Sequence, residues 1–142
     1  MTADKHPVLR YAPAVVMTLL IPVLSLLPSR FFRHMAQPLP PIPCIDKIVH
    51  ALMYAALTAA YLLALSRDRR SRLAFVLRVV LLAALYGLAM EVCQKLFTSS
   101  RAMDPLDALA NTFGALVSAL LAYAWVRRRT GVAESPADCQ ST

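Results

Sequence analysis

Four apolar stretches, each long enough to cross a lipid bilayer, constrain this chain more than any other feature. They span residues 11–29, 48–66, 73–97 and 108–126, which is 19, 19, 25 and 19 residues. At about 1.5 Å per residue, a helix of about 19 residues covers roughly 28 Å, close to the thickness of the hydrocarbon core. In lipid the backbone must bond within its own segment, so each stretch is predicted to be a helix.

The whole chain fits one all-α membrane domain. Of its 142 residues 58% are hydrophobic and 16% are charged, whereas soluble domains are about 45–50% apolar. We predict a four-helix domain over residues 1–130, with helices at about 11–29, 47–66, 73–97 and 105–127, and a disordered cytoplasmic tail over 131–142. Pro22 should kink the first helix. A cleaved signal peptide is the alternative for that helix, but no small-residue cleavage site follows it.

Basic residues predict the orientation of the four helices. Nine of them fall on one side: Lys5, Arg10, Arg67, Arg69, Arg70, Arg72, Arg127, Arg128 and Arg129. Five fall on the other: Arg30, Arg33, Lys47, Lys95 and Arg101. Because basic loops stay in the cytoplasm, both termini are predicted to be cytoplasmic. The net charge of +7 reflects this asymmetry, and no motif indicates a nucleic-acid partner.

Polar residues on three of the helices fall in one layer near the outer surface. The second helix contributes Asp46, Lys47 and His50, the third Glu91, Gln94 and Lys95, and the fourth Asp104, Asp107 and Asn111. His50 lies one turn beyond Asp46, so both share a face. Glu91 and Asn111 each lie about six residues inside their helices, or roughly 9 Å deep. We therefore predict a single polar pocket at the outer-leaflet side.

Helix capping offers a structural alternative for the acidic residues. Asp104 precedes Pro105, the arrangement of an N-cap followed by proline at the first helical position. Asp107 lies three residues later, where a capping-box acid would sit. Asp46 can cap the second helix in the same way.

Packing and snorkelling offer alternatives for most of the other polar residues. Asn111, with Gly114 and Ser118 on the same stripe, can serve helix–helix packing. Lys47 and Lys95 can extend their side chains to the membrane interface. Tyr54 can fill space in the bundle with a ring that has one polar end.

Glu91 has no such simple explanation. A carboxylate one and a half turns inside a membrane helix costs several kcal/mol unless it is paired or protonated. Its candidate partners are Arg101, Lys95 and His50, and a purely structural ion pair is the alternative to a functional role.

Two segments resemble the VanZ-like family of small bacterial membrane proteins. They are "DKIVHALMYAAL", from position 46, and "YGLAMEVCQKLFTSSRAMDPLDALANTFG", from position 86. The matching positions are Asp46, Lys47, His50, Tyr54, Glu91, Gln94, Arg101, Asp107, Asn111 and Gly114. Ser99-Ser100 and Ser118 depart from the pattern, where proline or glycine is often found. The resemblance implies a multi-pass protein of the bacterial plasma membrane and a link to teicoplanin resistance, but no specific activity.

An enzyme acting on an amphiphile of the outer leaflet is the first functional hypothesis. The substrate's tail would stay in lipid while its head group enters the polar pocket. The candidate catalytic residues are Glu91, His50, Asp107 and Asp46, with His50 or Glu91 as general acid or base and an aspartate orienting the histidine. The candidate substrate-binding residues are Arg101, Lys47, Gln94, Asn111 and Tyr54.

Three alternatives remain. The same pocket can bind a lipid or lipoglycopeptide head group without turnover, or Glu91 and His50 can relay protons in a transporter. A metal site is also conceivable, since His50, Glu91 and the aspartates are ligand types that suit zinc or manganese. With one histidine in the pocket and no ligand spacing, we expect no metal and no cofactor. The three cysteines lie far apart in the sequence and show neither metal-ligand spacing nor a disulfide framework. The sequence leaves the oligomeric state open.

Overall fold

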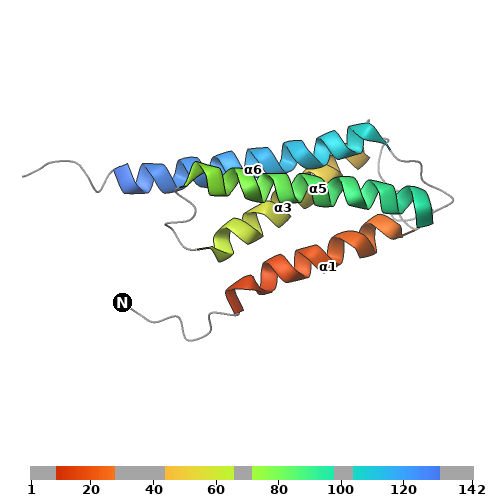
Figure 1. Ribbon diagram of the computed structural model, residues 1–142, viewed down its shortest axis with the longest axis horizontal. Coiled ribbons are helices and arrows are strands. Elements are labelled where there is room, and N and C mark those ends of the chain that lie inside the picture. The colour runs from red at the N-terminus through yellow and green to blue at the C-terminus, as the bar shows by residue number, and fades with distance from the viewer. Residues whose placement is uncertain (1–8, 28–43, 66–71, 98–103, 132–142) are drawn as a thin grey trace, which may run out of the picture.

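The protein is an all-helical bundle, seen here in a computed structural model that describes residues 9–27, 44–65, 72–97 and 104–131. A short 3-10 turn, η1 (Leu9–Tyr11), leads into α1 (Ala12–Leu26), followed by α3 (Ile45–Ala64), α5 (Leu73–Phe97) and α6 (Pro105–Gly131). Four segments are long and apolar enough to span a membrane, and the described residues form no strand. The four-helix membrane fold predicted from the sequence is therefore confirmed. Successive helices run in opposite directions (Figure 1).

Two helix ends differ from the predicted bounds. The first helix was expected to continue to position 29 but ends at Leu26, and Leu27 is extended, with φ −62° and ψ 138°. Leu27 precedes Pro28, and the proline ring disfavours helical backbone at the residue before it. At the other end of the chain, α6 continues past position 127 to Gly131. The predicted tail from 132 onward lies outside the described residues.

The outside of the bundle is apolar, unlike that of a soluble protein. Large apolar side chains cover the outside, including Leu19, Leu63, Leu82, Leu121 and Phe113. Apolar residues such as Ile21, Leu57 and Ala115 form the core, and polar residues are buried beside them: Ser25, His50, Thr58, Glu91, Gln94 and Asn111. An apolar exterior around a partly polar interior is what a lipid solvent requires, since membrane-embedded polar groups face the bundle interior.

The helices α3 and α6 form the most extensive contact in the bundle. A Cβ added at Gly114 of α6 would overlap the backbone carbonyl group of Ala51 in α3, so the missing side chain permits the close approach. The first helix packs against this pair and α5 through polar contacts. Tyr86 donates a hydrogen bond to the Thr18 carbonyl (2.7 Å), and the Thr18 hydroxyl lies 3.0 Å from that of Tyr61.

Candidate functional site

The polar residues of three helices meet at one end of the bundle. This is where α3 and α6 begin and where α5 ends (Figure 1). His50, Glu91 and Asn111 are all buried there, one from each helix. Local hydrophobicity makes these segments helices, and their antiparallel packing brings the three side chains together.

Lys47 is surrounded by three carboxylates. Its ammonium nitrogen lies 3.0 Å from Asp46, 2.8 Å from Asp104 and 3.1 Å from Asp107. The Lys47 side chain is only 24% exposed. Three acceptors match the three donors of an ammonium group, so Lys47 is held by the protein itself.

Asp104 has two roles at the start of α6. One carboxylate oxygen accepts a hydrogen bond from the Leu106 amide (2.9 Å), which confirms the predicted N-cap. Asp46 does not cap α3, because the N-cap position is Cys44, which makes no side-chain capping bond. That alternative for Asp46 is wrong, and the side chain pairs with Lys47 instead.

The Lys47 ammonium holds the pKa of the Asp104 carboxyl below its ordinary value, and the Leu106 amide adds to this effect. A depressed carboxyl pKa stabilises the fold above the unfolded value of about 3.9, and this contribution is lost as pH falls through the folded value. The Lys47–Asp104 ion pair is therefore intact at neutral pH.

His50 lies at the centre of the cluster. Its Nδ1 is 3.1 Å from the Asn111 Oδ1, and a carbonyl oxygen only accepts, so Nδ1 is the donor. The same nitrogen lies 3.9 Å from Glu91 Oε1, and Nε2 lies 3.9 Å from Asp107 Oδ2. Both separations exceed hydrogen-bond length. Asn111, rather than an aspartate, therefore orients the ring in this structure.

Glu91 is fully buried, with 0% relative exposure, and neither carboxylate oxygen has a hydrogen-bond partner within the described part of the chain. Of its predicted partners, His50 is near. Lys95 is exposed, and no ion pair joins it to Glu91 among the described contacts. Arg101 lies outside the described residues.

The two remaining predicted residues face other neighbours. Gln94 is buried and donates a hydrogen bond to the Ser25 carbonyl of α1 (3.2 Å), which ties α5 to α1. Tyr54 is buried against Tyr86, with ring centroids 6.2 Å apart, and its hydroxyl has no hydrogen-bond partner among the described residues. Gln94 thus stabilises the bundle, whereas Tyr54 adds an unsatisfied polar group one turn from His50.

Sequence reasoning missed Thr58 and Ser25. The Thr58 hydroxyl is buried without a described hydrogen-bond partner, one turn beyond Tyr54 on the α3 face that carries His50. His50, Tyr54 and Thr58 are spaced four residues apart, and this spacing is the sequence signal that places them on one helix face. Ser25 lies seven residues after Thr18, so both share the side of α1 that contacts α5.

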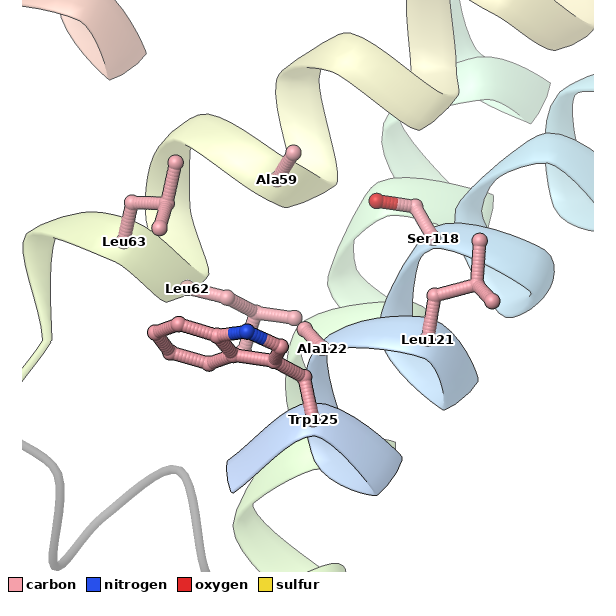
Figure 2. Close-up of a pocket in the computed structure, with 7 residues that line it drawn as sticks. All are labelled: Ala59, Leu62, Leu63, Ser118, Leu121, Ala122 and Trp125. Atoms are coloured by element: carbon pink, nitrogen blue, oxygen red, sulfur yellow. The ribbon is translucent and has the colours of Figure 1, made fainter. Parts of the chain in front are cut away.

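An apolar groove of about 330 Å³ opens between α3 and α6, away from the polar cluster (Figure 2). Its lining residues are Ala59, Leu62, Leu63, Ser118, Leu121, Ala122 and Trp125. Leu63 follows His50 by 13 residues, or roughly 20 Å along the helix. The groove is therefore a separate feature in the opposite half of the bundle.

Comparison with known protein families identifies the chain. A family model described as VanZ/LLP1 matches residues 7–127, which include all four helices of the bundle up to the last turn of α6. The chain belongs to the VanZ/LLP1 family. Membership links it to a membrane family associated with teicoplanin resistance. No curated protein and no solved structure matches it.

The polar cluster of this VanZ/LLP1 protein combines two chemical environments. Around Lys47, charges are paired and partly exposed, whereas Glu91 and His50 are buried ionisable groups 3.9 Å apart. Two sets of possible metal ligands also meet here, His50 with Glu91 and Asp107, and Asp46 with Asp104 and Asp107.

Proposed function

We propose that the polar cluster of this protein receives the head group of an amphiphile from the outer leaflet of the bacterial plasma membrane. The hydrocarbon chain of the amphiphile would remain in lipid beside α3, α5 and α6. In this orientation both termini are cytoplasmic, as the distribution of basic residues predicts. The proposal names a polar lipid or a lipid-linked cell-envelope intermediate as the class of ligand.

The burial of Glu91 carries the proposal. A carboxylate with no hydrogen-bond partner in the described chain costs free energy in a membrane protein, and such residues persist where function needs them. Glu91 also lies on the inner side of the cluster, with His50 between it and Asp107. This order supports a polar path from the three aspartates around Lys47 inward to Glu91.

His50 is the group best suited to proton transfer within the cluster. Its Nδ1 is engaged by Asn111, which leaves Nε2 with a lone pair in the neutral ring. A histidine held in one tautomer can accept a proton from an attacking hydroxyl or water and return it to a leaving group. Glu91, 3.9 Å away, would stabilise the protonated ring.

Turnover and binding are separated by one experiment with the purified protein. The full chain in detergent is incubated with a lipid extract from a bacterial envelope, and both retained lipid and released products are measured by mass spectrometry. We expect enrichment of one lipid class, with conversion if the site is catalytic. A Glu91→Gln, His50→Ala double variant should lose both signals.

Arg78→Gln is the matched control, since this exposed residue lies near the opposite end of α5. Unchanged lipid retention and conversion in the double variant would overturn the proposal. Retention without conversion would assign the site to binding alone.

A further inference from the structure

Two sets of metal-ligating residues share Asp107. In the outer set, Asp46, Asp104 and Asp107 each offer one oxygen, and in the inner set His50 offers a ring nitrogen beside oxygens of Glu91 and Asp107. Within each set the chosen ligand atoms all lie within 4.8 Å of one another. The two sets differ in whether a cation of the protein already neutralises their negative charge.

The outer set already has its cation. Lys47 lies within 3.1 Å of all three aspartates, so its ammonium group occupies the position that a metal ion would take. A divalent ion could enter only by displacing it. The outer set is therefore an internal ion-pair network.

The inner set has two carboxylates and no comparable cation among the residues that the structure describes. Neither oxygen of the fully buried Glu91 has a described hydrogen-bond partner. Glu91 Oε1 lies 3.9 Å from His50 Nδ1, and Asp107 Oδ2 lies 3.9 Å from the other ring nitrogen, Nε2. Asn111 Oδ1 accepts a hydrogen bond from Nδ1–H, which leaves Nε2 as an electron-pair donor. In metal sites, a ligating histidine typically donates its other N–H to such an oxygen.

We propose that His50, Glu91 and Asp107 bind a divalent cation of the zinc or manganese class. One imidazole and two carboxylates suit either metal, and three protein ligands leave at least one coordination position for water or a ligand oxygen. Bonds of about 2.0–2.2 Å require the ligand atoms to draw together by up to about 1.5 Å, and Glu91, which now lies near Nδ1, to turn toward Nε2. Asn111 would orient the histidine without touching the ion. The site does not depend on the amphiphile proposed above, but an ion on Nε2 would occupy the lone pair assigned there to proton transfer.

Metal binding is tested on the full-length protein in detergent without added lipid. After chelator treatment and dialysis, the protein is titrated with Zn²⁺ and with Mn²⁺, and bound metal is measured by elemental analysis. We expect one ion per chain and a higher unfolding temperature in its presence. His50→Ala and Glu91→Gln should each weaken binding by about tenfold or more.

Asp46→Asn is the matched control, because Asp46 belongs to the outer set alone. Its metal affinity should stay within about twofold of the wild type, since its loss leaves the three inner ligands in place. Metal binding that survives Glu91→Gln but is lost in Asp46→Asn would place the ion in the outer set and overturn the proposal.

Wild-type protein loaded with Co²⁺ provides a readout that needs no variant. Coordination by a ring nitrogen and carboxylates should change the visible absorption of Co²⁺ from that of the hydrated ion, and Zn²⁺ should reverse the change. An unchanged spectrum, or no ion retained and no shift in unfolding temperature with millimolar Zn²⁺ and Mn²⁺, would also overturn it. Lipid retention without metal would leave the proposed function standing and remove only this inference.

Discussion

At the scale of single residues, Lys47 and Glu91 lie at the same end of the bundle but in opposite environments. Lys47 is partly exposed and has three carboxylate partners, so its charge is well compensated. Glu91 is fully buried and has no hydrogen-bond partner in the described chain. The first is a stabilising contact within the protein, and the second is a group whose burial opposes stability.

Glu91→Met should therefore stabilise the protein while abolishing its function. Removing a buried, unsatisfied polar group should raise the free energy of unfolding by about 1–3 kcal/mol. The measurement is thermal unfolding in detergent with a chelator present, so that metal does not contribute. Glu91→Gln, which keeps a polar side chain of similar size, is the control and should change stability less. A less stable Glu91→Met would instead indicate a structural ion pair, with His50 or Arg101 as the partner.

At the scale of helices, α3 and α6 decide the shape of the polar end. Their approach depends on Gly114, and it brings His50 of one helix to Asn111 of the other. Helix α5 adds Glu91 to this pair, and it is joined to α1 through Gln94 and Tyr86. The cluster is therefore built on rigid helices rather than on loops.

Gly114→Ala should destabilise the bundle even though alanine favours helices by about 1 kcal/mol over glycine. The added methyl group would overlap backbone atoms of Ala51, which cannot move without separating the helices. We expect a loss of about 1–3 kcal/mol in unfolding free energy, measured by thermal unfolding.

Gly87→Ala, at a less crowded glycine, is the variant whose stability is compared with that of Gly114→Ala. Its Cβ would lie 3.1–3.2 Å from side-chain atoms of Asn111 and Tyr54, which can shift slightly. A smaller effect than at Gly114 is expected. Equal stability of both variants and the wild type would contradict the close approach of α3 and α6.

At the scale of the whole molecule, function depends on which side of the membrane the polar end faces. The helices alternate in direction, so the ends of α3, α5 and α6 that carry the cluster share one side. The excess of basic residues lies at the opposite ends of the same helices. This arrangement predicts that the cluster opens toward the periplasmic or extracellular leaflet.

Accessibility labelling of intact cells tests this topology. Cys44 is exposed and directly precedes α3, so a membrane-impermeant maleimide should label it from outside. In a variant with Cys44, Cys93 and Cys139 changed to serine, Ser71→Cys should react only after the cells are permeabilised. Labelling of Ser71→Cys in intact cells would reverse the topology and place the cluster in the cytoplasmic leaflet.

How much could be predicted from the sequence differs between fold and site. The four helices follow from apolar length alone, which is a local property, and Phe97 is both the predicted and the observed end of α5. The end of α1 was placed three residues too late, because the effect of Pro28 on Leu27 was outweighed by continuing hydrophobicity. The convergence of His50, Glu91 and Asn111 was predictable because, in helices that alternate in direction, these three residues lie at similar depths in the membrane.

The partners of these residues were not predictable, because they depend on how each helix is rotated about its axis and how closely it approaches its neighbours. Lys47 was expected to bind substrate or reach the surface, yet three aspartates hold it. The hydrogen bond that the Gln94 amide donates to the Ser25 carbonyl of α1 was likewise not predicted.

The amino-acid sequence by itself determined that lipid is the solvent, that the backbone is helical, and which polar residues must turn inward. These follow from transfer free energies and helix geometry, which act residue by residue. Only the tertiary structure decided that Lys47 neutralises the outer carboxylates while Glu91 has no hydrogen-bond partner among the described residues. Such pairing depends on distances of a few ångströms between helices, and the close packing at Gly114 determines them.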